Sequence, residues 1–174
     1  GQDLNKYSIR PKTVSYLLGY PTLFIGTLLA KIQIKGSKNI PRKGSFIVVC
    51  NKFSLLDHHF VIFAICKPIN FLMASDQTVG AHFFWAPWLY WFIPTNRKKI
   101  APTTIKKAIS ALRKSEIVGI FPEGTTTEHY IRPAKKWAAY FAMTTGAPIL
   151  PISLIGMDNI WKNWLKGIRP KLYI

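Results

Sequence analysis

The chain has 174 residues, is 49% hydrophobic and 14% aromatic, and carries 24 Lys and Arg against 7 Asp and Glu, a formal net charge of +17. This length fits a single domain with a sizeable core, and the charge implies an anionic partner: nucleic acid, an anionic membrane surface or a phosphorylated substrate. The absence of zinc-finger spacing and of RNP-like segments argues against nucleic acid, and the two cysteines form neither a CxxC pair nor part of a metal-ligand cluster.

The first distinctive segment runs from Thr13 to Ala30 without a charged residue and is flanked by Arg10, Lys12 and Lys31. Pro21 lies in its middle and is expected to bend or split a helix there. We predict that residues 1–31 form a membrane-associated segment, as a helix or helical hairpin lying in one leaflet. A single membrane span and a buried core helix remain alternatives.

From residue 31 onward, strand-like and helix-like segments alternate, which predicts an α/β fold with a largely parallel central sheet flanked by helices. Strands are predicted within 31–36, 45–51, 69–75, 116–121 and 147–156, and helices within 56–66, 77–92, 101–115 and 134–146, with a basic loop at 93–99. Residues 32–174 are therefore assigned to one domain. The abrupt strand-like ending "RPKLYI" is consistent with a truncated C-terminus.

Basic residues along the chain are interleaved with Trp and aliphatic runs, as in "KKWAAYF" and "NIWKNWLKGIRPK". Lys and Arg beside Trp is a composition typical of a membrane interface. We therefore predict an anionic membrane surface as a partner and no nucleic acid, although a basic nucleic-acid-binding protein stays an alternative. The free cysteines indicate a reducing location, on the cytosolic face of the membrane.

Three of the predicted loops carry polar residues of the kinds that make an active site. Lys52 and Asp57 follow the strand "FIVVC", Arg97 lies in the basic loop, and Glu123 begins the turn "EGT" after "EIVGIF". In α/β sheets, functional loops lie beyond the carboxyl ends of the strands. We expect these side chains to converge there, with three ordinary surface loops as the alternative.

The motifs "VVCNKFSLLD", "FIPTNR", "FPEGTTT" and "APILPISL", in this order and spacing, resemble the glycerol-phosphate and lysophosphatidic acid acyltransferase family over residues 32 to 157. The resemblance implies an α/β domain at a membrane that moves an acyl chain from acyl-CoA or acyl carrier protein to a lyso-lipid hydroxyl. The implied acceptor is of the 1-acyl-glycerol-3-phosphate type, in phospholipid biosynthesis, and no cofactor or metal is implied.

The same resemblance assigns roles to individual residues. In the first motif Asn51, Ser54 and Asp57 match, but Lys52 occupies the position of the family's catalytic histidine. That histidine is the general base for the acceptor hydroxyl, and the aspartate orients it. Arg97 is implied to hold the acceptor phosphate.

The third motif adds further candidate substrate-binding residues, Glu123, Gly124 and Thr125, with Thr126 where the family usually has an arginine. Loss of one of two arginines is expected to weaken phosphate binding or to favour another head group.

Lys52 decides whether the chain is a working enzyme. To act as a base near neutral pH, a lysine must lower its pKa from about 10.4 to about 7, and a neighbouring carboxylate such as Asp57 opposes that change. We therefore expect Lys52 to stay protonated. Three possibilities remain open: a lysine base produced by desolvation, a pseudoenzyme or lipid-binding protein of the same fold, and an introduced substitution. His58 and His59 are expected to be helix-start or interfacial residues rather than displaced bases.

Overall fold

The computed structural model describes residues 21, 24, 28, 30–53, 56–74, 91–95, 100–123, 136–157 and 160–174. Its main element is a five-stranded sheet with the spatial order β4-β3-β5-β2-β6, in which every adjacent pair is parallel. The strands are β2 (Ile47–Cys50), β3 (Ile69–Ala74), β4 (Trp91–Thr95), β5 (Ile117–Ile120) and β6 (Ile149–Ile152). The predicted α/β fold with a parallel central sheet is confirmed.

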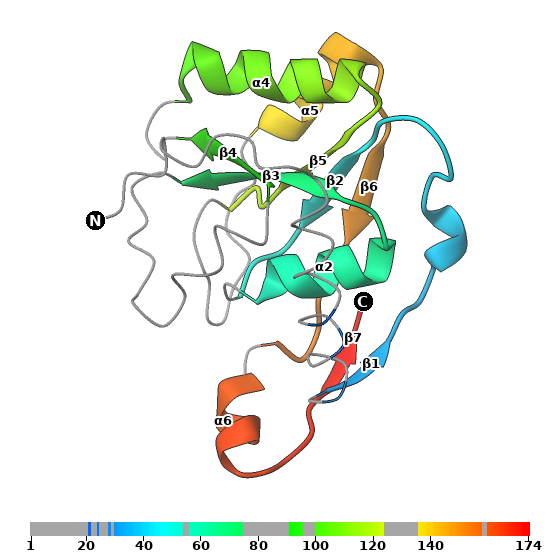
Figure 1. The fold of residues 1–174 in the computed structure, drawn as a ribbon, viewed down its shortest axis with the longest axis vertical. Helices are drawn as coiled ribbons and strands as arrows, with labels where there is room; N and C mark the ends of the chain where they lie inside the picture. Colours follow the sequence, from blue (N-terminus) through cyan, green and yellow to red (C-terminus); the bar gives the residue numbers. More distant parts are fainter. Residues whose placement is uncertain are drawn as a thin grey trace.

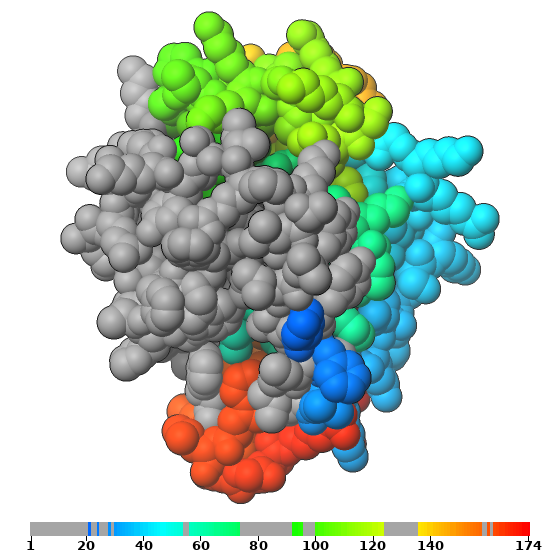
Figure 2. Space-filling view, viewed as in Figure 1, coloured from blue at the N-terminus to red at the C-terminus, as the bar shows by residue number. Residues whose placement is uncertain are grey.

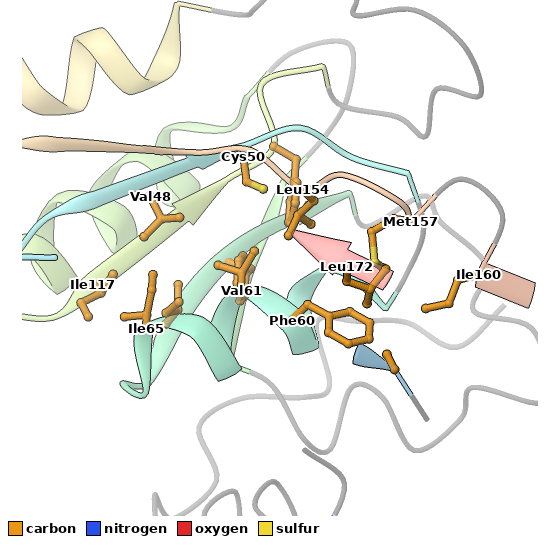
Figure 3. Close-up of a cluster of buried hydrophobic side chains, with 14 of the residues drawn as sticks. Val48, Cys50, Phe60, Val61, Ile65, Ile117, Leu154, Met157, Ile160 and Leu172 are labelled. Atoms are coloured by element: carbon orange, nitrogen blue, oxygen red, sulfur yellow. The ribbon is translucent and has the colours of Figure 1, made fainter. Parts of the chain in front are cut away.

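Helices cover both faces of this sheet (Figure 1). One face packs against α2 (Asp57–Ile65), and the other against α4 (Pro102–Arg113) and α5 (Trp137–Thr145). Because successive side chains of a strand point to opposite faces, Val48 joins the core under α2 while Ile47 joins the core under α4 and α5. This explains why the central strands read as continuous apolar runs. Figure 3 shows the core under α2.

Local sequence features set the ends of the helices. Pro102 lies in the first turn of α4, where a missing N–H costs nothing, and the Thr104 hydroxyl donates to the Pro94 carbonyl oxygen at 2.6 Å. This bond ties α4 to β4. Helix α5 ends at Gly146, whose φ of 72° lies in the left-handed region that glycine adopts without strain.

A second, two-stranded parallel sheet pairs β1 (Lys31–Gln33) with β7 (Lys171–Tyr173). The 3-10 helix η2 (Ser37–Asn39) follows β1, and α6 (Ile160–Leu165) precedes β7. In Figures 1 and 2, α6 and β7 lie at the end of the molecule opposite α4. The strand predicted within 31–36 and the strand-like character predicted for "RPKLYI" are both confirmed.

Strand β4 corrects one prediction. Trp91 and Phe92 were assigned to an aromatic helix and the next three residues to a basic loop, but residues 91–95 pair with β3. Pro94 within this stretch favours a loop in the sequence, yet β4 is an edge strand with a partner on one side only. A proline is tolerated on such a strand because one row of its backbone groups has no ladder to join.

The membrane-associated segment predicted at residues 1–31 lies outside the described residues, apart from Pro21, Phe24, Leu28, Ala30 and Lys31. Pro21, Phe24 and Leu28 have helical backbone conformation. Within the described part of the chain, no helix combines the length and the apolar character needed to cross a membrane. The division into residues 1–31 and 32–174 stays a prediction.

Gly119 on β5 leaves room for side chains of the neighbouring strand β3. A Cβ at this position of β5 would lie 2.4 Å from Cδ1 of Phe71 and 2.9 Å from Cγ2 of Ile69, both on β3. Phe71 is fully buried and stacks on Phe121, with ring centroids 5.6 Å apart. Phe121 follows β5 directly and is the first residue of the loop that carries Glu123. Because Gly119 has no side chain, the Phe71 ring has room to lie where Phe121 stacks on it.

Candidate functional site

Two central strands, β2 and β5, deliver the polar residues of the site. The strands are direct neighbours, with Val49 opposite Ile120, and their chains continue into Lys52 and Glu123. Both side chains are almost fully buried, as is Asp57 at the start of α2. Three charged side chains are therefore buried at the carboxyl edge of the sheet, where α/β proteins place their ligands.

All three charges affect the pKa of the thiol of Cys50, the last residue of β2. Burial raises its pKa far above the ordinary value, the negative charges of Asp57 and Glu123 raise the pKa further, and the positive charge of Lys52 lowers it. Because electrostatic influence falls with distance, Lys52, Asp57 and Glu123 all lie near Cys50. The thiol stays protonated, so Cys50 is not a nucleophile at neutral pH.

Lys52 turns its ammonium group toward an aromatic ring. Its Nζ lies 4.7 Å from the centroid of Phe121, and 6% of the residue is exposed. The face of an aromatic ring attracts a cation, and it offers nothing comparable to a neutral amine. The position therefore favours the protonated lysine, as do the two carboxylates around Cys50.

Asp57 joins the loop after β2 to the start of α2. It is fully buried, and its Oδ2 accepts a hydrogen bond from the Phe53 backbone N–H at 2.5 Å. The first turn of a helix stabilises a negative charge because its free N–H groups carry partial positive charge. Asp57 thereby fixes the backbone of the residue that follows Lys52.

His58 and His59 begin α2, as predicted, and both are buried. The His58 ring lies edge-on to Phe71 and Phe121, with both centroid distances 4.7 Å. His58 is thus part of the aromatic core beneath Lys52, a position that no spacing in the sequence indicates.

Burial lowers the pKa of His59 to about 4. The unfolded chain binds this proton near pH 6.5, so stability is complete above that pH and falls as the pH drops toward 4, by up to about 3 kcal/mol. We expect His59→Gln to flatten this part of the pH profile, measured as the free energy of unfolding in urea between pH 7 and pH 4.5. An equal acid loss in the variant would assign the effect to the carboxylates instead.

Asn51 connects the site to the segment after β6. Its Nδ2 donates to the Leu154 carbonyl oxygen at 2.9 Å, and its Oδ1 accepts the Leu154 N–H at 2.7 Å. Leu154 is almost fully buried, and Figure 3 shows it beside Cys50. Both ends of the amide bind within the protein, and the second N–H of Nδ2 is the donor left over for the predicted substrate contact of Asn51.

We expect Asn51→Ala to destabilise the protein by roughly 2–4 kcal/mol, because it leaves the buried N–H and C=O of Leu154 without their partner. Urea unfolding measures this loss. A suitable control is Asn70→Ala, since the Asn70 amide donates to Glu116 and to the Ile117 backbone at the start of β5. Both variants should lose stability, but only the Asn51 variant should lose function. Equal functional losses would contradict a positioning role for Asn51.

Four predicted site residues, Ser54, Arg97, Gly124 and Thr125, lie outside the described residues, and their roles stay predictions. The strand before Arg97, β4, is separated from β5 by β3.

Comparison with known proteins agrees with this architecture. The family model described as Acyltransferase matches residues 31–155. The chain is 31% identical over 149 residues to a 1-acyl-sn-glycerol-3-phosphate acyltransferase of Borreliella burgdorferi, covering 83% of this chain and 59% of that protein. It is 27% identical over 154 residues to the Bacillus subtilis protein of the same name, covering 85% of this chain and 74% of the relative.

Among solved structures, the chain is similar to the 1-acyl-sn-glycerophosphate acyltransferase PlsC of Thermotoga maritima, with a TM-score of 0.64 at 23% identity. The match covers 93% of this chain and 65% of that one. The chain therefore spans about three-fifths of the Borreliella relative and about two-thirds of the Thermotoga structure. The structural likeness supports the fold described above.

Proposed function

Because the chain belongs to the acyltransferase family, to which 125 of its residues (31–155) match, we propose that it transfers an acyl chain from acyl-CoA or acyl carrier protein to the hydroxyl of a lyso-lipid. The acceptor is 1-acyl-glycerol-3-phosphate, the substrate that the names of the relatives give for those proteins. The reaction takes place at an anionic membrane surface on the cytosolic face, within phospholipid biosynthesis.

The observation that carries this proposal is the burial of Lys52, Asp57 and Glu123 beyond the ends of the neighbouring strands β2 and β5. In the proposed reaction the acceptor oxygen bonds to the thioester carbonyl carbon, the carbon–sulfur bond breaks, and the hydroxyl proton ends on the leaving thiol. A base is needed to carry that proton. Asp57 orients the residue at position 52, Arg97 holds the acceptor head group, and Glu123 with Gly124 shapes the acceptor site.

One contact favours a second candidate function. The Lys52 ammonium above the Phe121 ring has no free electron pair with which to accept a proton. A chain with this site binds the acyl donor and the lyso-lipid but turns them over slowly, as a pseudoenzyme or lipid-binding protein of the same fold.

Radiolabelled acyl-CoA and acyl carrier protein, each supplied with lysophosphatidic acid or lysophosphatidylcholine in vesicles, test the proposal. Turnover with the phosphate acceptor supports acyl transfer. Saturable binding of the lyso-lipid without turnover supports the second candidate. Neither turnover nor binding, together with a gel shift on RNA, would overturn both in favour of a basic nucleic-acid-binding protein.

A further inference from the structure

Helix α6 and the turn after it present apolar side chains to solvent. Leu165 is 89% exposed and Ile168 is 52% exposed. The opposite side of the same segment is anchored, because Ile160 and Leu172 are buried in the core. The exposed side chains therefore lie on an ordered part of the fold.

The turn itself explains why the exposure of Ile168 is unusual. The N–H groups of Gly167 and Ile168 donate to the carbonyl oxygens of Trp164 and Asn163, at 2.9 and 2.8 Å, and Gly167 has a φ of 65°. This is the paired hydrogen-bond pattern that ends many helices, and a hydrophobic residue at the position of Ile168 usually packs back on the helix. Here the residue opposite it is Asn163, and Ile168 points outward instead.

Cationic side chains surround these apolar ones. Four exposed basic residues lie within ten positions of each other: Lys162, Lys166, Arg169 and Lys171. No Asp or Glu occurs from Ile160 to Ile174. Positions 162, 165 and 166 share one face of the helix, since residues three and four apart are neighbours on it. We call Leu165, Ile168 and these four basic residues the α6 surface.

Ala30 and Lys31 contact the segment that follows α6. The Arg169 guanidinium donates to the Ala30 carbonyl oxygen at 3.1 Å, and the Lys31 N–H donates to the Pro170 carbonyl oxygen at 2.8 Å. The chain that leads to these contacts carries Phe24 and Leu28, which are 63% and 58% exposed. Figure 2 shows the blue atoms of this stretch beside the red atoms of the C-terminal segment.

We propose that the α6 surface docks on a bilayer that contains anionic lipid, with Leu165 and Ile168 inserted among the acyl chains and the four basic residues at the head groups. Charge complementarity selects this occupant, because each basic residue near an anionic leaflet favours binding. A second copy of the chain fits poorly, since a symmetric contact through this surface would set four cations against four cations.

The segment after β6 connects the carboxyl edge of the sheet to the α6 surface. Leu154, which Asn51 binds, follows β6, and the chain continues from it into α6. In Figure 1, β6 runs toward the end of the molecule at which α6 lies. The inference rests on the proposed function only in that the acceptor and product are membrane lipids.

A fluorophore that reports its environment tests the contact directly. It is attached to Leu165→Cys in a Cys66→Ser background, because the native Cys66 thiol is exposed and would also be labelled, whereas Cys50 is buried. A matched control carries it on Met143→Cys of α5, which is 87% exposed and lies on the opposite side of the main sheet from α2. With phosphatidylcholine–phosphatidylglycerol vesicles, emission should shift to the blue at position 165 and stay unchanged at 143.

Affinity for the same vesicles should fall by about fivefold for each lysine in Lys162→Gln and Lys166→Gln, and roughly 25-fold for the pair. The control pair Lys106→Gln with Lys107→Gln, exposed on α4, should leave it unchanged. Leu165→Ser with Ile168→Ser should weaken binding by roughly tenfold or more.

Three results would overturn the proposal. These are no shift at position 165, equal shifts at 165 and 143, and a shift at 165 that depends on protein concentration without vesicles, which would indicate a second copy. Since the fluorescence requires no turnover, docking without activity would refute the proposed reaction alone. Turnover with no shift at 165 would refute the docking alone.

Discussion

Replacing Lys52 by histidine is expected to raise the rate of acyl transfer roughly 100-fold or more, the typical contribution of a positioned general base. The site already holds what such a histidine needs, because Asp57 is fully buried at the start of α2 and fixes the adjoining loop through Phe53. An imidazole near pH 7 is partly neutral and accepts a proton, whereas an ammonium above the Phe121 ring does not. The measurement is initial rates of radiolabelled product formation from acyl-CoA and lysophosphatidic acid.

Two further variants make this result specific to base catalysis. Lys52→Gln removes the charge without supplying a base and should give no gain. Adding Asp57→Asn to the histidine variant should remove most of the gain, because the imidazole loses the carboxylate that orients it. A native chain that already turns over well, and slows when Lys52 becomes histidine, would show that lysine is the base.

The second large effect concerns stability. Asp57→Ala should lower the free energy of unfolding by roughly 3–5 kcal/mol, as expected when one charge of a buried set is removed. The Phe53 N–H loses its acceptor, and the buried Lys52 ammonium is left with less compensating negative charge nearby. Urea unfolding followed by circular dichroism measures the loss. Asp57→Asn should cost less, because its side-chain oxygen still accepts from Phe53.

A double-mutant cycle separates the two causes. Lys52→Met should relieve much of the cost of Asp57→Ala, since no buried ammonium then remains to be compensated. Strictly additive losses would show that the Lys52 and Asp57 charges do not interact, and that the cost arises from the Phe53 hydrogen bond alone.

Most strands of the main sheet were predictable because a buried strand has a recognisable pattern of apolar residues in its own sequence. A strand buried on both faces must be apolar at every position, and "FIVVC" and "IVGIF" have this character, so β2 and β5 were found with nearly correct bounds. Helix α4 was equally clear, because Ile105, Ala108, Ile109 and Leu112 recur at helical spacing and Pro102 marks its start.

Strand β4 was missed for a reason that lies outside its own sequence. Its aromatic residues suit a helix or a strand, and Pro94 suits neither interior. Only its position at the sheet edge, beside β3, makes the proline acceptable. An edge position is a property of the whole fold and leaves no mark in the neighbouring residues.

For the site, motif order predicted that Lys52, Asp57 and Glu123 come from loops that follow strands, and the structure buries all three beyond the ends of β2 and β5. The bonds between Asn51 and Leu154 join residues 103 positions apart, and the His58 ring meets Phe121 from another loop. Neither contact has a local signature, because each depends on which strands become neighbours.

The strand order of the main sheet also determines when the site can form during folding. Ile47 pairs with Val118 and with Ile149, so the strand that precedes Lys52 has no partner close to it in sequence. Contacts between distant segments slow folding, because long loops must close before any stabilisation is gained. During synthesis the residues around Lys52 must wait until β6 has left the ribosome, and a nascent chain halted before it should expose β2 to chaperones.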